Sequence, residues 1–238
     1  MSAIMIVAAV LPALFLWLYT CRKDTQKEPM SQMVKALLYG MGIVVPVILI
    51  EEFVSDLLFD GNDPTTILGT AVEAFFVAAI PEEFMKLLAL YLILRKNSFF
   101  DEHYDGIVYA VCVSLGFATI ENVSYIISDT DIWFGVAVTR ALLAVPGHYA
   151  FAVLMGYYYS LWYFGGKSTK NCVCMLLVPV VAHGFYDTIA LSAKVSPELG
   201  GLCFILLVYF CIRLHKFAHK KVMIQINKDL IQTAESAE

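Results

Sequence analysis

Seven ionisable residues interrupt otherwise apolar stretches of this chain, and their types suit hydrolytic chemistry. They are Glu82, Glu83, Lys86, Glu121, His148, His183 and Asp187. Imidazoles and carboxylates are ligands for zinc, and both move protons in catalysis. A Glu whose pKa is raised by burial can act as a general base. The set therefore predicts hydrolysis, either assisted by a divalent metal or carried out by a Glu–His pair that activates water directly.

The spacing places several of these side chains on shared helix faces. Glu82 and Lys86 are four residues apart with Glu on the N-terminal side, the favourable order for an intrahelical pair. We interpret Lys86 as a structural counter-ion to Glu82 or Glu83. His183 and Asp187 are also four apart, as in helical metal-ligand pairs.

The candidate residues divide into two overlapping sets. We assign Glu82 and Glu83 to water activation and transition-state stabilisation, with one of them as general base. The candidate catalytic residues are Glu82, Glu83, Glu121, His148 and His183. The candidate metal ligands are Glu121, His148, His183 and Asp187, with zinc as the expected ion if one is bound.

The composition indicates that membrane helices position these residues. The chain is 60% hydrophobic and 16% charged, whereas soluble domains carry about 25% charged residues. Apolar segments recur along its length, each near the roughly 20 residues that a spanning helix needs. We expect an all-α polytopic bundle of about seven spans: residues 4–19, 33–50, 67–94, 106–127, 147–164, 172–191 and 199–214.

One apolar stretch, residues 132–164, is too long for a single span, at about 50 Å as a helix. We expect Pro146-Gly147 to break it, with an interfacial or re-entrant helix before the fifth span. We also expect one transmembrane domain over residues 1–222 and a polar cytoplasmic tail over residues 223–238.

The loop charges predict the orientation. Basic clusters follow the first, third, fifth and seventh segments, and acidic residues gather in the alternate loops. By the positive-inside rule, the N-terminus lies outside and the C-terminus in the cytoplasm. The chain has no basic nucleic-acid patch and no Gly-rich phosphate loop, so we expect no nucleic-acid partner. Cys172 and Cys174 are interpreted as packing residues.

The polar residues of four spans fall at one depth. With a rise of about 1.5 Å per residue, they lie roughly 17 to 24 Å from the cytoplasmic ends of their spans. Charges at this depth are costly, so they face the bundle interior and usually serve function. The agreement predicts one site just outside the membrane midplane.

Four sequence blocks resemble the PrsW-type intramembrane proteases. Residues 81–86 (PEEFMK) fit the E-E-x-x-K motif of that family, and residues 100–122 are similar to its second block. Gly147-His148 and residues 183–187 (HGFYD) match the third and fourth blocks, and residues 22–29 are similar to the first loop. The distantly similar CAAX prenyl endopeptidases carry His where this chain has Glu121.

The resemblance implies a protease of the bacterial cell membrane that works within the lipid bilayer. Its implied substrate is a single-pass membrane protein, an anti-sigma factor, whose cleavage starts a cascade that frees a sigma factor under envelope stress. The site's depth places cleavage near the extracytoplasmic side. The family has been classed both as metallo- and as glutamate-type, so the metal stays open here.

Two other functions compete with proteolysis. Chains of buried Glu, His and Asp also serve as proton relays, so a proton-coupled transporter is the second hypothesis. The two halves show no clear internal repeat, which many transporters have. A non-catalytic membrane scaffold is the third, and it would gain nothing from such costly charges.

Overall fold

The computed structural model describes residues 2–236, which are helical almost throughout and hold no β-strand. In chain order the elements are α1 (Ala3–Lys23), α2 (Met30–Gly42), α3 (Val44–Phe59), α4 (Ile67–Val72), η1 (Glu73–Ala79), α5 (Ile80–Leu94), α6 (Asp105–Ser128), α7 (Trp133–Thr139), η2 (Arg140–Ala144), α8 (Val145–Phe164), α9 (Thr169–Val195), η3 (Pro197–Leu199) and α10 (Gly200–Ser236). The predicted all-α membrane bundle is confirmed.

Within residues 2–236, six helical stretches are long and apolar enough to cross a membrane. They are Ala3–Lys23, Met30–Phe59, Asp105–Ser128, Trp133–Phe164, Thr169–Val195 and Pro197–Glu235. Of the seven predicted spans, the third (residues 67–94) is not among these six. It is helical along its whole length as α4, η1 and α5, but it carries Glu73, Glu82, Glu83 and Lys86.

The helix continues through Pro146-Gly147. The expectation of a separate interfacial or re-entrant helix before this pair is therefore wrong. Residues 133–164 form one continuous helix through α7, η2 and α8. Proline lacks an N–H and clashes with the carbonyl four residues back in a regular α-helix. Here a π-helical turn precedes it, in which the Val145 N–H donates to the Arg140 carbonyl five residues back. The wider turn accommodates the proline without ending the helix.

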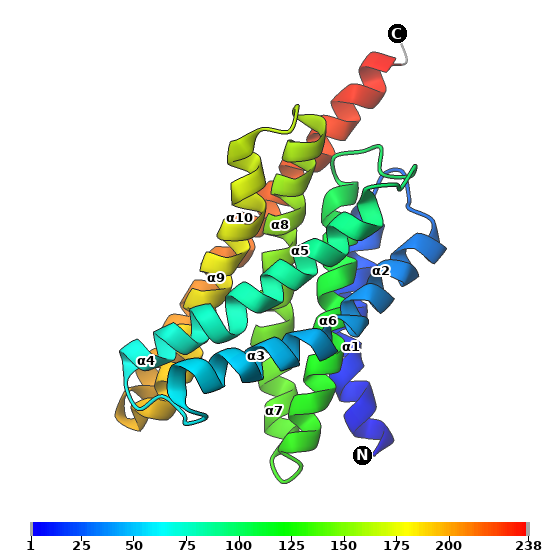
Figure 1. Cartoon of the computed structure of the whole chain (residues 1–238). Helices are drawn as coiled ribbons and strands as arrows, with labels where there is room; N and C mark the ends of the chain where they lie inside the picture. The colour runs from blue at the N-terminus through cyan, green and yellow to red at the C-terminus, as the bar shows by residue number, and fades with distance from the viewer. Residues whose placement is uncertain (1, 237–238) are drawn as a thin grey trace.

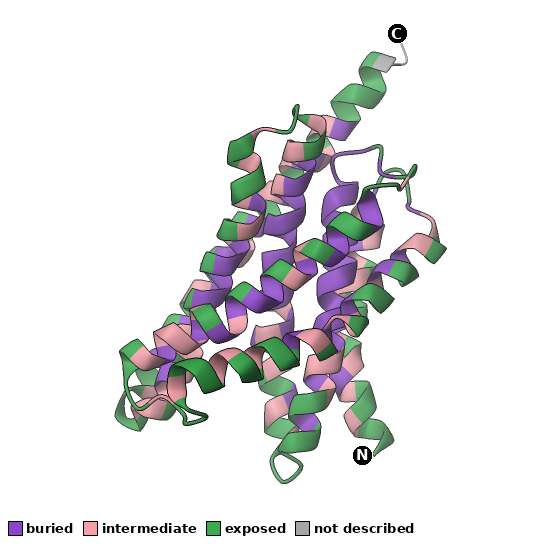
Figure 2. Cartoon of the chain, in the orientation of Figure 1, coloured by how far each residue is buried: buried purple, intermediate pink, exposed green. Residues whose placement is uncertain are grey.

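Helices α6 and α8 form the centre of the bundle. Almost every residue from Asp105 to Thr119 of α6 is buried, and so is nearly all of residues 145–160 of α8. Helix α6 packs against α1, α2 and α8, and α8 packs against α9 and α10. Figure 2 shows the buried residues gathered along these inner helices, with exposed residues on the outer elements. The exposed side chains of α1 and α10 include Phe15, Phe204 and Ile205, as expected for surfaces that face lipid.

Glycines allow the central helices to approach closely. A Cβ at Gly40 of α2 would overlap the Val113 carbonyl of α6, and one at Gly156 of α8 would overlap the Gly106 carbonyl of α6. Small residues at such contacts are typical of membrane helix pairs, where close backbone packing replaces the hydrophobic driving force. The contacts fix α6 between α2 and α8.

The two termini lie at opposite ends of the bundle (Figure 1). The loops over residues 24–29 and 95–104 share one end with the C-terminal part of α10, which we call the C-terminal end. There Gln225 donates to the Tyr157 carbonyl, and Asp229 accepts from the His103 and Tyr104 N–H groups. The predicted boundary after residue 222 thus falls inside α10, a helix that continues to contact the bundle. The membrane orientation stays a prediction.

Candidate active site

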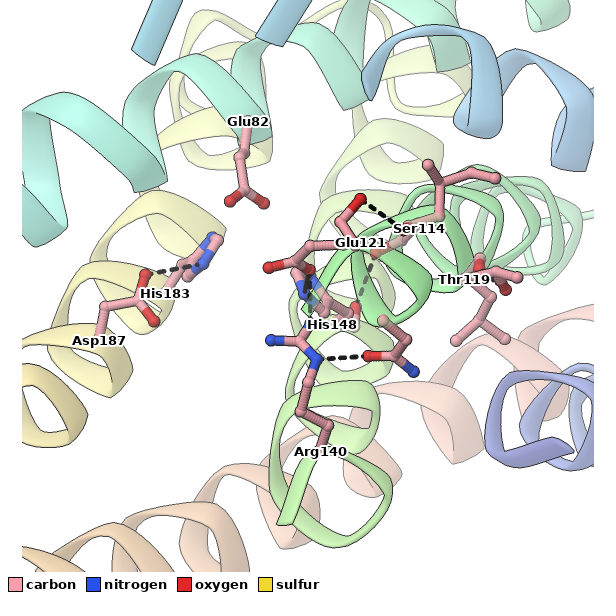
Figure 3. A network of polar contacts seen from close by, with 12 residues as sticks. Glu82, Ser114, Thr119, Glu121, Arg140, His148, His183 and Asp187 are labelled. Atoms are coloured by element: carbon pink, nitrogen blue, oxygen red, sulfur yellow. Dashed lines mark hydrogen bonds and ion pairs between the residues drawn. The ribbon is translucent and has the colours of Figure 1, made fainter. Parts of the chain in front are cut away.

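Four helical segments bring the predicted site residues into one cluster. Glu82, Glu83 and Lys86 come from α5, Glu121 from α6, His148 from α8, and His183 with Asp187 from α9. In Figure 3 the Glu82 carboxylate points into the space between the His183–Asp187 pair on one side and Glu121 and His148 on the other. The structure therefore gathers residues that lie up to about 100 positions apart, as the shared depth predicts.

Lys86 occupies the centre of the cluster. Its Nζ donates to Glu82 Oε2 at 2.8 Å and to Glu83 Oε1 at 2.9 Å, and it lies 3.3 Å from His148 Nδ1. The ammonium also lies 4.3 Å from the centre of the Phe117 ring, a cation–π contact. Lys86 thus pairs with both glutamates, whereas the sequence predicted one or the other.

The two histidines are held in the same way. His148 Nε2 lies 2.7 Å from Glu121 Oε2, and His183 Nε2 lies 3.1 Å from Asp187 Oδ2. An ionised carboxylate only accepts hydrogen bonds, so both Nε2 atoms carry the proton and both Nδ1 atoms face the α5 carboxylates and Lys86. His148 Nδ1 then accepts from Lys86. Glu121 and Asp187 fix the ring orientations.

His183 differs from His148 in what its Nδ1 meets. That atom lies 3.0 Å from Glu83 Oε1, which is also an acceptor. Two acceptors cannot hydrogen-bond to each other, so either a proton or a metal cation lies between them. The ring stacks on Phe151, with centroids 4.7 Å apart, and this packing holds Nδ1 in position.

Arg140 closes the cluster on the side of η2. Its Nη2 lies 2.9 Å from Glu121 Oε2, and its Nε donates to Asn122 Oδ1 at 2.6 Å. Arg140 thus pairs with an acid inside the bundle. The contact to Asn122 was not predicted. In the sequence, the sign of both Arg140 contacts was a cation within an apolar stretch.

The α5 glutamates and His183 form a group that fits a metal ion. Glu82, Glu83 and His183 each offer one ligand atom, and these atoms lie within 4.8 Å of one another. Glu83 Oε2 is buried and accepts no hydrogen bond. Catalytic zinc sites use three such protein ligands and leave a position for water. The charge balance also favours a bound cation. The four carboxylates of the cluster face only two permanent cations, Lys86 and Arg140.

This group differs from the ligand set predicted from the sequence. His183 belongs to both sets, but Glu121 is held by Arg140 and His148, and Asp187 lies behind His183. Glu121 and Asp187 therefore occupy positions that orient the histidines. The sequence could not separate the two sets because all of these residues share one depth.

A π-helical turn precedes each of two site segments. The Ile80 N–H donates to the Phe75 carbonyl five residues back, just before Pro81-Glu82-Glu83. The η2 turn stands in the same relation to Pro146-Gly147-His148. Such turns shift the following side chains round the helix axis and are frequent at functional sites. The sequence signalled them only through the prolines.

The centre of the cluster is closed, and its outer residues are partly open. The side chains of Glu83 and Lys86 are 1% exposed, whereas those of Glu121 and Asp187 are 20% and 22% exposed. An open pocket of about 440 Å³ lies between α3 and η1, with Glu51 and Val77 among its lining residues. Glu51 interacts electrostatically with Glu82, Glu121, Lys86 and His183, so this pocket borders the cluster. The cluster is therefore partly open beside Glu121 and Asp187, and an open pocket borders it at Glu51.

Comparison with known proteins decides the family. The model of a family described as "PrsW family intramembrane metalloprotease" matches residues 28–214. The chain belongs to the PrsW family. Protease PrsW of Geobacillus kaustophilus is 37% identical over 194 residues, which cover 80% of this chain and 81% of the relative. Protease PrsW of Bacillus subtilis is 33% identical over 226 residues, covering 92% and 97%. No solved structure matches the chain.

Membership in the PrsW family makes this chain a membrane protease, as the sequence motifs predicted. It decides in favour of hydrolysis over proton-coupled transport or a non-catalytic scaffold. The six apolar helices and the bacterial relatives place the protein in a bacterial membrane, which it crosses several times.

Proposed function

We propose that this PrsW-family protease hydrolyses a peptide bond of a single-pass membrane protein at the Glu82–Glu83–His183 centre. The observation that carries the proposal is Glu83 Oε2, a buried carboxylate oxygen without a donor beside His183. A buried acceptor without a partner costs about 1–3 kcal/mol, a cost that catalytic use explains. The substrate that the family resemblance implies is an anti-sigma factor.

Glu83 acts as the general base, and Glu82 assists it. Glu83 Oε2 takes a proton from water, and the water oxygen forms a bond to the scissile carbonyl carbon. As the C–N bond breaks, the same proton passes to the departing amine nitrogen. Lys86 holds both glutamates in position through its contacts at 2.8 and 2.9 Å. Proton transfer by a positioned side chain contributes about 10²- to 10⁴-fold to a rate.

The histidine–carboxylate pairs position the water and the developing oxyanion. The rings of His148 and His183 lie with centroids 5.6 Å apart, and each is held from behind by its own carboxylate. A zinc ion, if bound, would be held by Glu82, His183 and the Oε1 atom of Glu83, which leaves Oε2 of Glu83 as the base. The ion would polarise the scissile carbonyl and lower the pKa of a bound water.

The predicted orientation places the cluster toward the outer leaflet. With the N-terminus outside, the site lies beyond the midplane, and cleavage falls near the extracytoplasmic end of the substrate helix. The partly open side at Glu121 and Asp187 is where we place substrate entry.

Co-expression with a single-pass anti-sigma factor tests the proposal. The wild-type protein should shorten the substrate and switch on a reporter that depends on its sigma factor. Glu83→Ala and His183→Ala should do neither while accumulating in the membrane at normal levels. Asp131→Asn, an exposed loop change, is the matched control and should cleave normally. Undiminished cleavage by Glu83→Ala would overturn the assignment.

A further inference from the structure

A second cluster of buried acids lies at the C-terminal end of the bundle. It joins the α1–α2 loop to the α5–α6 loop and the start of α6, the region where these loops meet in Figure 1. Its four carboxyl residues are Asp24, Glu28, Glu102 and Asp105, each 6% exposed or less. Asp24, Glu102 and Asp105 each bring one carboxylate oxygen within 4.8 Å of the others. We call these four residues the acidic loop cluster.

The acidic loop cluster has no cationic partner. Across residues 2–236, no Lys, Arg or His forms an ion pair with any of the four. Their donors are neutral. Gln26 Nε2 donates to Glu102 Oε1 at 2.6 Å, the Tyr109 hydroxyl donates to Glu28, and the Glu102 N–H donates to Asp105 Oδ2 at 2.7 Å. Buried charges in proteins are normally paired or coordinate a metal.

Two oxygens of the cluster are left without any donor. Asp24 Oδ1 and Asp105 Oδ1 are buried and accept no hydrogen bond. Burial and the nearby Glu102 carboxylate raise the pKa of Asp24 to about 6. Burial and the nearby Asp24 carboxylate likewise raise the pKa of Glu28 to about 7. A hard cation binds several carboxylate oxygens at once. The cluster offers one such oxygen from each of three residues within 4.8 Å, and two of these residues have an oxygen without a donor.

We propose that Asp24, Glu102 and Asp105 bind a hard divalent cation, Mg²⁺ or Ca²⁺. Glu28 borders this site and accepts a hydrogen bond from the Tyr109 hydroxyl of α6. The cation ties the α1–α2 loop to the loop between α5 and α6. Since α5 carries Glu82 and Glu83 and α6 carries Glu121, the bound cation fixes these helices relative to each other from a distance. The site is separate from the Glu82–Glu83–His183 centre and stands whether or not that centre holds zinc.

Thermal unfolding of the purified full-length protein in detergent tests the proposal. After EDTA treatment and desalting, the unfolding midpoint is followed by tryptophan fluorescence while Mg²⁺ or Ca²⁺ is titrated. The wild-type midpoint should rise by about 5 °C at a concentration about 100-fold above the dissociation constant. Asp24→Asn and Asp105→Asn should lose this rise. Without cation, these two variants should be at least as stable as wild type, because each removes one repelling charge.

Two control variants make the result specific. Glu83→Gln removes a ligand of the active centre and should keep the full rise. Asp101→Asn changes an exposed acid on the same loop as Glu102 and should also keep it. A wild-type midpoint that ignores both cations would overturn the proposal. So would a rise that disappears in Glu83→Gln but survives in Asp24→Asn.

Direct cation binding covers the case in which the cluster variants do not fold. Manganese(II) binding to wild type and to Glu83→Gln is counted by electron paramagnetic resonance. Both should bind at least one ion that excess Mg²⁺ or Ca²⁺ displaces, and Glu83→Gln should keep this ion because the active centre does not hold it. Absence of a tightly bound ion in wild type would contradict the cation site.

Discussion

At the scale of single residues, the hydrogen bonds of Glu83 and His183 are incomplete. Glu83 has one oxygen engaged by Lys86 and His183 and another with no partner, all within a fully buried side chain. His183 has acceptors on both of its ring nitrogens. Neither residue is satisfied by its neighbours alone, and this is the property that a bound metal or a working proton transfer would resolve.

Zinc content separates the two possible ligand sets. Purified wild-type protein should hold about one equivalent of zinc, measured by inductively coupled plasma mass spectrometry. Glu83→Gln and His183→Ala should lose it, because each removes a ligand of the group that the geometry favours. Glu121→Gln should retain most of it, since Glu121 contacts His148 and Arg140 instead. Zinc loss in Glu121→Gln with retention in Glu83→Gln would favour the set predicted from the sequence.

The residue types of the site were predictable, and their pairing was not. Charged residues in apolar spans stand out by cost alone, and a common depth follows from counting residues along each helix. Which oxygen meets which nitrogen depends on helix rotation. Two π-helical turns set that rotation just before Pro81 and Pro146, and hydrophobic periodicity contains no sign of them.

At the scale of elements, close packing around α6 holds the site together. Gly40 meets the α6 backbone at Val113, and the Phe117 N–H lies 3.1 Å from where a Cβ would stand. Helix α6 carries both Phe117, which contacts Lys86, and Glu121, which contacts His148. A displaced α6 would therefore disturb the centre at two points.

Two glycines of α2 give a matched test of this packing. Gly40→Ala should lower the free energy of unfolding by roughly 1–3 kcal/mol, because the added methyl overlaps the α6 backbone. Gly42→Ala, two residues away with open space around it, should raise stability by up to about 1 kcal/mol through helix propensity. Denaturation in mixed detergent micelles measures both. Equal stability of the two variants would contradict the close approach.

At the scale of the whole molecule, the chain passes back and forth between the two ends of the bundle, as the loop charges indicate. Six apolar stretches and the charged residues 67–94 place the termini at opposite ends of the bundle (Figure 1). The kind of segment could be predicted because lipid enforces long apolar runs. The number differs, because seven spans were expected and six stretches of residues 2–236 are apolar enough to cross a membrane. The acidic loop cluster could not be predicted, because Asp24 lies far in sequence from Glu102 and Asp105, and only the fold brings them together.

The loop charges also predict on which side of the membrane each loop and the C-terminus lie. A fluorescent protein fused after residue 238 should fluoresce, because the basic loops hold the C-terminus in the cytoplasm. An alkaline phosphatase fusion after Asp131 should be active, since that acidic loop is expected outside. The reverse pattern would place the active centre toward the cytoplasmic face and move the expected cleavage position with it.

Cleavage by the reconstituted protein tests whether Glu83 is the catalytic base. Wild-type protein and Glu83→Gln are placed in liposomes with a purified single-pass anti-sigma factor, and the single-turnover cleavage rate is measured. Glu83→Gln keeps the size of the side chain but removes the base. Its rate should be at least about 100-fold below that of wild type, with unfolding behaviour and substrate binding preserved. Cleavage by Glu83→Gln at the wild-type rate would contradict a catalytic role for the Glu82–Glu83–His183 centre.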